Sequence, residues 1–256
     1  MTRAEQNAQK GPGTQEMGLF GKKLFKTYRK HPVLRGVDVT VRPGEAVGLL
    51  GANGAGKTTC FYLIAGFLNP DAGSVHIDGK EITTRSVYKR ARRGLGYLPQ
   101  ESSVFRGLNV ENNLRAALQA QRKLSAAERT EQLESLLTDF SLSHLRYARA
   151  DALSGGERRR VEIARALAVK PRYLLMDEPL AGIDPVSVSE VIGMIGHLRQ
   201  RGVGLLITDH NVRETLNFVD RAYILHEGTI LAEGEPERII GDDAVREVYL
   251  GQDFRV

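Results

Sequence analysis

The sequence predicts an α/β fold with a largely parallel central sheet. Short apolar segments alternate with helical patterns along the chain, which is typical of βαβ units. One such segment leads directly into a glycine-rich loop, GANGAGKTT at 51–59, and a helical pattern follows this loop. Four segments are apolar almost throughout, as expected for strands covered on both faces: AVGLL (46–50), YLLMD (173–177), GLLITD (204–209) and AYILH (222–226). We therefore expect one large α/β domain that begins near Leu19.

Helical periodicity marks three further segments. The helix after the glycine loop is expected to continue through FYLIAGFL (61–68). Residues 101–153 are poor in strand patterns, and Ser125 with Glu128 forms a capping box, so we interpret about 101–160 as a helical subdomain inserted in the core. Two apolar stripes predict buried helix faces: Leu133, Leu136, Leu137 and Phe140 in one helix, and Val188, Val191, Ile192, Ile195 and Leu198 in another.

Two regions favour antiparallel pairing instead. VDVTV (37–41) alternates between apolar and polar residues and precedes the turn signal Pro43-Gly44. SVHIDG (74–79) and the residues around Glu227-Gly228 have the pattern of hairpins. The sequence therefore predicts an antiparallel β flank beside the parallel core.

Composition restricts the class of protein. The chain has 256 residues, no apolar run of about 18 residues that could span a bilayer, and a single cysteine, Cys60, which excludes an intrachain disulfide. Residues 1–17 lack the apolar centre of a signal peptide and are interpreted as a disordered polar tail. The net charge is +5, and the basic clusters at 89–93 and 158–160 are interpreted as solvated helix faces, with a nucleic-acid or anionic-membrane surface as the alternative.

The glycine loop matches the phosphate-binding pattern G-x-x-x-x-G-K-[ST], with the preceding strand and following helix that this pattern requires. Glycines let backbone N–H groups converge on phosphate oxygens, and the helix N-terminus adds partial positive charge. Lys57 is expected to neutralise the terminal phosphates. The Thr58 hydroxyl is expected to ligate Mg²⁺, and Thr59 to add a phosphate contact.

The predicted strand YLLMDE (173–178) ends in two carboxylates. Asp177 is placed as an acid that acts on Mg²⁺, and Glu178 as the group that polarises the attacking water. His210 follows the neighbouring strand, at the edge of an open sheet where ligands bind, and is a candidate for holding that water in line. Gln100 is expected to reach Mg²⁺ or the water when the helical subdomain closes over the nucleotide.

A second glycine-containing helix start, LSGGE at 153–157, raises a separate question. Ser154 and Glu157 form a capping box, which does not require Gly155 and Gly156. Paired glycines at a helix start expose backbone N–H groups to an anion. Because the glycine loop already surrounds the chain's own nucleotide, we interpret this second cradle as serving a nucleotide held by another chain.

In this order, GANGAGKTT, Gln100, LSGGE, YLLMDEP, AGID and His210 resemble the nucleotide-binding domain of ABC ATPases over about residues 18–240. The resemblance implies a P-loop NTPase fold with a RecA-like core, an antiparallel β flank and an inserted helical subdomain. It also implies ATP hydrolysis, with ATP and Mg²⁺ bound. The implied ATP contacts are Tyr28 against adenine, and Asn53, Gly54, Ala55, Gly56, Lys57, Thr58 and Thr59; the implied Mg²⁺ contacts are Thr58, Gln100 and Asp177.

The same resemblance implies that two copies pack head to tail. The signature residues Ser154, Gly155, Gly156 and Glu157 of one copy then close on the ATP of the other. Asp184 belongs to the segment Ala181-Gly182-Ile183-Asp184, which links the two active sites and departs here from the commoner S-A-L-D pattern. We expect that departure to alter communication between the two sites without abolishing hydrolysis.

Several stretches are similar to one kind of transporter ATPase. YLPQESSVFRGLNVENNL, LSGGERRRVEIARALA, LITDHNVRETL and VYLGQDFRV resemble the ATPase subunit of the lipopolysaccharide export system. That resemblance implies a homodimer at the cytoplasmic face of the inner membrane, which powers two integral membrane permease subunits and binds no nucleic acid. It places Phe105 and Arg106 in the groove for the coupling helices of these partners, and gives residues 241–256, with Tyr249 and Phe254, a contact between subunits.

Two alternatives remain at this stage. The short helical subdomain and the C-terminus are also similar to ATPases of branched-chain amino acid importers. A soluble regulatory or nucleic-acid-associated ATPase is the third possibility, because the sequence pI is near 9.3.

Overall fold

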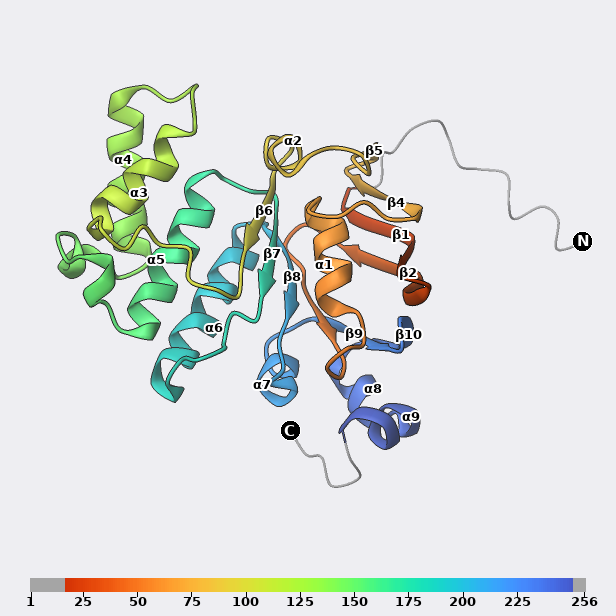
Figure 1. The fold of residues 1–256 in the computed structure, drawn as a ribbon. Helices are drawn as coiled ribbons and strands as arrows, with labels where there is room; N and C mark the ends of the chain where they lie inside the picture. Colours follow the sequence, from red (N-terminus) through yellow and green to blue (C-terminus); the bar gives the residue numbers. More distant parts are fainter. Residues whose placement is uncertain (1–16, 251–256) are drawn as a thin grey trace, which may run out of the picture.

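A computed structural model describes residues 17–250 and contains two β-sheets (Figure 1). The smaller sheet is antiparallel, with the order β2-β1-β4-β5 and strands β1 Leu19–Tyr28, β2 His31–Val41, β4 Ala72–Ile77 and β5 Lys80–Glu81. The larger sheet has the order β10-β9-β3-β8-β7-β6, with strands β3 Ala46–Leu50, β6 Leu95–Leu98, β7 Tyr173–Asp177, β8 Gly204–Thr208, β9 Arg221–His226 and β10 Thr229–Gly234. Its strands are parallel except β10, which pairs antiparallel with β9. The predicted parallel core and antiparallel flank are confirmed.

Helices connect the strands and cover the larger sheet. They are α1 Lys57–Ala65, α2 Val87–Ala91, α3 Val110–Gln119, α4 Ala126–Asp139, α5 Gly155–Ala168, α6 Pro185–Gln200, α7 Val212–Leu216, α8 Pro236–Gly241 and α9 Asp243–Val245. Three short helical turns complete the set: η1 Ser143–Leu145, η2 Ala150–Ala152 and the π-turn η3 Arg246–Leu250. In Figure 1, α3, α4 and α5 gather at the end of the molecule opposite the antiparallel sheet.

Alternate residues of the parallel strands enter two different hydrophobic clusters. On β7, Leu174 and Met176 pack with α5 and α6, whereas Tyr173 and Leu175 pack with α1 and the antiparallel sheet. The same alternation separates Leu205 and Ile207 from Leu206 on β8, as a period of two requires. The helices α1 and α5 therefore cover opposite faces of the parallel sheet, which explains why its strands are apolar almost throughout.

Local sequence signals explain most of the observed boundaries. Ser125 and Ser154 each begin a helix with a complete capping box, as predicted. The four predicted core strands and the hairpin at Glu227-Gly228 are confirmed. The prediction that the first helix runs through residue 68 is wrong, because Gly66 adopts φ +92 and ends α1 at Ala65.

The basic clusters are not only solvated surface. Arg90 and Arg159 are buried, so interpreting both clusters as solvated helix faces is wrong for these two residues. Arg90 donates hydrogen bonds to the carbonyl oxygens of Leu63 and Ile64, both at 2.6 Å, near the end of α1. A cation at this end of a helix also complements the helix dipole.

The predicted terminal segments lie mostly outside the described residues. Of the polar tail predicted at 1–17, the structure describes only Met17, which is exposed. Of the predicted C-terminal extension, residues 241–250 are described and Phe254 is not. Among residues 17–250, no helix is both long and apolar enough to cross a membrane.

Candidate active site

The glycine loop between β3 and α1 has the backbone geometry of a phosphate cradle. Gly51 lies against the carbonyl oxygen of Leu225, where a Cβ atom would come within 2.1 Å, and Gly56 adopts φ +109. Among the described helices of nine residues or more, α1 alone has no side-chain cap and no acidic residue in its first turn. Its first N–H groups are therefore available to an anion, which favours phosphate binding at this end of the sheet.

The side chain of Lys57 is held in place by backbone carbonyl groups of the glycine loop. Its ammonium group donates hydrogen bonds to the carbonyl oxygens of Gly51 at 2.7 Å and Ala52 at 3.1 Å. Burial lowers the pKa of the Lys57 ammonium below its ordinary value, while the carboxylates of Glu178 and Asp177 act in the opposite direction. Neither carboxylate makes a direct ion pair with Lys57 within the described structure, so the cation can still pair with an incoming phosphate.

Gln100, Glu178 and His210, which come from three separate loops, meet at one carboxylate oxygen. The Gln100 amide donates to Glu178 Oε2 at 2.7 Å, and His210 Nδ1 lies 3.3 Å from the same atom. Glu178 itself adopts φ +44, a strained backbone conformation for a residue with a side chain, and its N–H donates to the carbonyl of Thr208 at 2.9 Å. Strain of this kind clusters at functional sites, and here it turns the carboxylate toward both partners.

Asp177 ends β7 one residue earlier and is only 6% exposed. Its two carboxylate oxygens accept hydrogen bonds from the hydroxyl of Thr208 at 2.7 Å and from Tyr97 at 3.3 Å. These contacts fix the carboxylate in one orientation. Burial is the largest cause that raises the pKa of Tyr97, followed by the charge of Asp177, so Tyr97 stays a hydrogen-bond donor at neutral pH.

The predicted ligands of Mg²⁺ surround a common space. A pocket of about 520 Å³ is lined by Thr58, Gln100 and Asp177, with Tyr97 and Phe67 on its aromatic wall. Hydroxyl, amide and carboxylate oxygens are the hard donors that Mg²⁺ prefers. The residues present therefore fit a magnesium ion together with a phosphate held by the adjacent loop.

Tyr28, the predicted adenine contact, lies at the end of β1 and is 42% exposed. It pairs with His31 at the tip of the β1–β2 hairpin. Farther along the same hairpin, Val33 and Leu34 lie within 3 Å of the position that a Cβ atom on Gly56 would take. The hairpin thus joins the predicted base contact to the phosphate loop.

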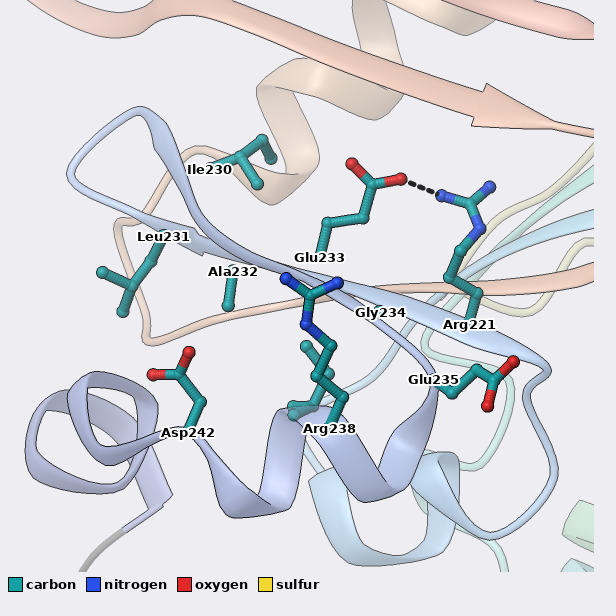
Figure 2. Close-up of a pocket in the computed structure, with 10 residues that line it drawn as sticks. Arg221, Ile230, Leu231, Ala232, Glu233, Gly234, Glu235, Arg238 and Asp242 are labelled. Carbon is teal, nitrogen blue, oxygen red and sulfur yellow. Dashed lines mark hydrogen bonds and ion pairs between the residues drawn. The ribbon is translucent and has the colours of Figure 1, made fainter.

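Figure 2 shows a different pocket, of about 630 Å³, between β9, β10 and α8. Its wall carries both signs of charge, including the ion pair between Arg221 and Glu233 at 2.6 Å and the side chains of Arg238 and Asp242. None of the predicted ATP contacts lines it. We therefore assign no nucleotide to this pocket.

The signature residues lie at the N-terminus of α5, away from the glycine loop. Ser154 accepts a hydrogen bond from the N–H of Glu157 at 3.2 Å, and the Glu157 carboxylate accepts one from the N–H of Ser154 at 2.8 Å. A Cβ atom on Gly155 would meet only the carbonyl oxygen of Gly182, at 3.4 Å, whereas a Cβ atom on Gly156 would come within 2.1 Å of Ser187 Oγ on α6. One of the two glycines therefore serves close packing between helices, a reason that was not anticipated from the sequence.

Asp184 joins this cluster from the segment before α6. It is the N-cap of α6 and accepts a hydrogen bond from the N–H of Ser187 at 3.1 Å. A Cβ atom on Gly155 would lie 3.4 Å from the carbonyl oxygen of Gly182. The predicted linking segment and the signature helix are thus in contact within one chain.

Phe105 and Arg106 lie on an exposed loop between β6 and α3. Phe105 is 50% exposed, which excludes simple core packing of its side chain. Its backbone N–H donates to Asn113 at 2.9 Å and its carbonyl accepts from the same side chain at 3.1 Å, while the guanidinium of Arg165 lies 4.6 Å from its ring. The loop therefore presents an aromatic side chain from a fixed backbone.

Tyr249 of the C-terminal extension packs within its own chain. It joins the cluster formed by Leu50, Leu216 and Ile239, among others. Burial raises the pKa of its hydroxyl, and a hydrogen bond with the backbone of Gly51 acts against that rise. The extension thus contacts the start of the chain's own phosphate loop, and its contact between subunits stays a prediction.

Four residues of this site were missed by sequence reasoning. Thr208, Tyr97, Arg159 and Glu162 hold the catalytic groups or the backbone around them. Thr208 ends the strand that precedes His210, and Arg159 and Glu162 follow the signature. All three therefore lie close in sequence to predicted site residues. Their residue types were not distinctive, and only the folded contacts reveal their roles.

With this geometry established, comparison with known proteins identifies the family. The family model described as ABC transporter matches residues 34–181, more than half of the chain. The chain belongs to the ABC transporter family. It is an ATP-binding subunit and an ATPase of that family, and its predicted fold class is confirmed.

Individual relatives agree with this assignment. A probable ABC transporter ATP-binding protein of Azorhizobium caulinodans is 53% identical over 96% of this chain and 87% of its own length. The lipopolysaccharide export system ATP-binding protein LptB is 54% identical in Acidithiobacillus ferridurans and 52% identical in Escherichia coli K12, over 93% of this chain. These matches cover 98% and 99% of the two LptB chains, respectively.

Solved structures are similar to this chain over most of its length, and a second family model matches its C-terminal residues. The ADP conformation of an ABC transporter ATP-binding cassette has a TM-score of 0.82 at 30% identity, and the match covers 93% of this ATPase and all of that chain. A dimeric post-hydrolysis cassette bound to ADP and phosphate has a TM-score of 0.74 at 25% identity, covering 85% of this ATPase and 98% of that chain. A model described as branched-chain amino acid ATP-binding cassette transporter matches residues 229–255.

Proposed function

We propose that this ATPase powers the export of lipopolysaccharide, as the nucleotide-binding subunit of a transporter in the inner membrane. The observation that carries the proposal is the 52% identity to the lipopolysaccharide export ATP-binding protein of Escherichia coli K12, over 93% of this chain and 99% of that one. The agreement extends over nearly the whole of both chains, so it includes segments beyond the nucleotide site.

ATP binding is assigned to the glycine loop and the hairpin beside it. Asn53, Gly54, Ala55 and Gly56 present backbone N–H groups, Lys57 and Thr59 contact phosphate, and Tyr28 stacks on adenine. Mg²⁺, when bound, neutralises charge on the phosphates, and Thr58, Gln100 and Asp177 supply the oxygen atoms that hold it, directly or through water. The fixed orientation of Asp177 supports this role.

Hydrolysis is assigned to the three side chains that meet at Glu178 Oε2. Glu178 is the general base that polarises the attacking water. His210 and Gln100 hold the carboxylate, and through it the water, in line with the terminal phosphate. The distances of 2.7 and 3.3 Å to the same oxygen support this arrangement.

A second copy of the chain completes each ATP site. Ser154, Gly155 and Gly156 cover the ATP held by the other copy, because α5 packs on the opposite face of the sheet from α1, which begins at the phosphate loop of its own chain. Asp184 beside them connects the two sites. The dimeric state of the relative that binds ADP and phosphate supports pairing of two copies.

The membrane subunits dock at Phe105 and Arg106. An exposed aromatic anchor with a neighbouring cation suits a partner helix that lies in a groove. ATP binding closes the dimer, hydrolysis reopens it, and the movement of α3, α4 and α5 is passed to two permease subunits. The ATPase then lies at the cytoplasmic face of the membrane as a peripheral subunit.

The test is affinity purification of the tagged full-length ATPase from its native membranes in mild detergent. We expect two integral membrane subunits to co-purify together with bound lipopolysaccharide. Phe105→Ala should reduce this recovery while ATP binding by the ATPase alone stays unchanged. Recovery of no membrane protein by the wild-type chain would contradict the proposal.

One observation favours a second candidate. The C-terminal residues 229–255 match the branched-chain amino acid transporter model, so an ATPase of an amino acid importer is the alternative. The same purification separates the two functions. Importer-type permeases without lipopolysaccharide would retain every ATP-site assignment and replace the cargo.

A further inference from the structure

A buried ion pair on α5 lies between the loop that carries Phe105 and the loop that carries Glu178. The side chains of Arg159 and Glu162 are 6% and 4% exposed, and their charged groups are 3.0 Å apart. Removing two charges from water is unfavourable unless both make further hydrogen bonds. The partners of this pair therefore show what it holds together.

Glu162 holds the segment that leads to Phe105. Its Oε1 atom accepts hydrogen bonds from the hydroxyl of Ser102 and the N–H of Ser103, both at 2.8 Å. Arg165 lies on the next turn of α5. Its guanidinium donates a hydrogen bond to the Ser103 carbonyl and lies against the Phe105 ring. Side chains of α5 thus contact Ser102, Ser103 and the ring of Phe105.

Arg159 holds the catalytic backbone from the same helix. Its guanidinium donates to four carbonyl oxygens: Pro99 at 3.0 Å, Pro179 at 3.1 Å, Asp177 at 3.3 Å and Glu178 at 3.4 Å. Pro99 directly precedes Gln100, and the other three surround the catalytic carboxylate in sequence. One buried cation therefore sets the backbone on both sides of the Gln100–Glu178 hydrogen bond.

We propose that Arg159 and Glu162 are a positioning pair that transmits displacement of the Ser102–Phe105 segment to the catalytic groups Glu178 and Gln100. The source of that displacement, a membrane subunit at Phe105, rests on the proposed function. Tightly packed interiors transmit strain, so a shift of the guanidinium moves every carbonyl that it holds. A misplacement of about 1 Å at a catalytic group can lower turnover by up to about 10²-fold.

The pair should act on turnover and not on ATP affinity. Within the described chain, the hydrogen bonds of Arg159 and Glu162 go to residues 99–103 and 177–179, and none goes to the glycine loop at 51–59. The proposed phosphate and adenine contacts at the glycine loop and Tyr28 are therefore not bonded to the pair, and its substitution should leave ATP affinity largely unchanged. A change in kcat without a change in KM is the expected sign of a positioning role.

The decisive variant is the double substitution Arg159→Met/Glu162→Gln. Either single substitution leaves one buried charge without its partner and risks unfolding, whereas the double variant removes both charges. A glutamine at the second position still accepts hydrogen bonds from Ser102 and Ser103, so the segment stays attached while its link to the catalytic loop is lost. We expect kcat of the full-length ATPase to fall by about 10-fold, with the KM for ATP within about twofold of wild type.

Glu111→Gln is the matched control. Glu111 makes ion pairs with Arg115 and Arg146, both at 2.6 Å, in the same group of helices. It has no hydrogen bond to the catalytic loop, so its substitution should leave kcat unchanged. The positioning role is overturned if the folded double variant keeps wild-type kcat, or if its KM rises in step with the loss of kcat.

Transmission is tested by the ratio of turnover in the transporter complex to turnover of the isolated ATPase. We expect the membrane subunits to change turnover of the wild type and of Glu111→Gln, and to leave the double variant unaffected although it still co-purifies with them. If the double variant shows the same ratio as the wild type, the proposed transmission is overturned. If no membrane subunit binds the wild type, the proposed function fails together with the transmission, and the kcat and KM of the isolated ATPase still decide the positioning role.

Discussion

Glu178 combines a strained backbone with two side-chain partners on one oxygen, and at the residue scale this combination supports its proposed role as the general base. A φ of +44 is unfavourable for glutamate, and the surrounding contacts hold it there. Gln100 and His210 approach Oε2, so the second carboxylate oxygen is free of both and can accept a proton from water. The site is arranged around this carboxylate and not around the imidazole.

The substitution Glu178→Gln removes the base and keeps the volume of the side chain. We expect ATP binding to persist and kcat to fall by about 10²- to 10⁴-fold, the usual contribution of a positioned general base. Glu131→Gln, on the exposed face of α4, is the control and should keep wild-type turnover. Turnover of Glu178→Gln close to wild type would assign the base to another group.

At the scale of helices, two capping boxes allow local stability to be separated from function. Ser125 and Ser154 each accept a hydrogen bond at 3.2 Å from the third N–H of their helix. Ser125→Ala and Ser154→Ala should therefore each lower the free energy of unfolding by about 1 kcal/mol. Only Ser154→Ala should also impair ATP-driven dimerisation, which size-exclusion chromatography with ATP can measure; an equal effect of both variants would make Ser154 a helix cap and nothing more.

The contact between α5 and α6 gives a second prediction at this scale. Gly156→Ala places a methyl group 2.1 Å from Ser187 Oγ and 2.5 Å from its Cβ, so the two helix starts must separate. Overpacking of this kind lowers the free energy of unfolding by about 1–3 kcal/mol. Adding Ser187→Gly removes both clashing atoms and should restore part of the stability and turnover, as thermal unfolding and ATPase assays can show. No recovery in the double variant would mean that Gly156 is needed for another reason.

The sequence predicted those helices and strands whose causes are local. The apolar strand at 173–177 and the capping box at Ser154 were predicted because a few adjacent residues determine them. The short strand β6 and the end of α1 were missed, since β6 is stabilised by pairing with β7, which is distant in sequence. Arg159 was expected at the surface because it belongs to a run of three arginines. Its burial could not be predicted, since its four carbonyl partners lie in two segments that only the folded chain brings together.

At the scale of the whole molecule, the helices on the two faces of the parallel sheet each begin at one half of the proposed ATP site. The glycine loop leads into α1 on one face, and the signature begins α5 on the other. Each chain therefore carries a glycine loop at one face of the sheet and the signature segment at the other. In the proposed head-to-tail pair, the signature segment of each chain lies against the ATP held by the other chain.

This account is tested most directly by mixing two variants that are each expected to lose ATP hydrolysis, Lys57→Ala and Ser154→Ala, and measuring the hydrolysis of the mixture. In the mixed dimer, both defects fall in one composite site, and the other site combines an intact glycine loop with an intact signature. We predict that the mixture hydrolyses ATP faster than either variant alone, in proportion to the fraction of mixed dimers. Activity of the mixture equal to the average of the two separate variants would contradict a site shared between two chains.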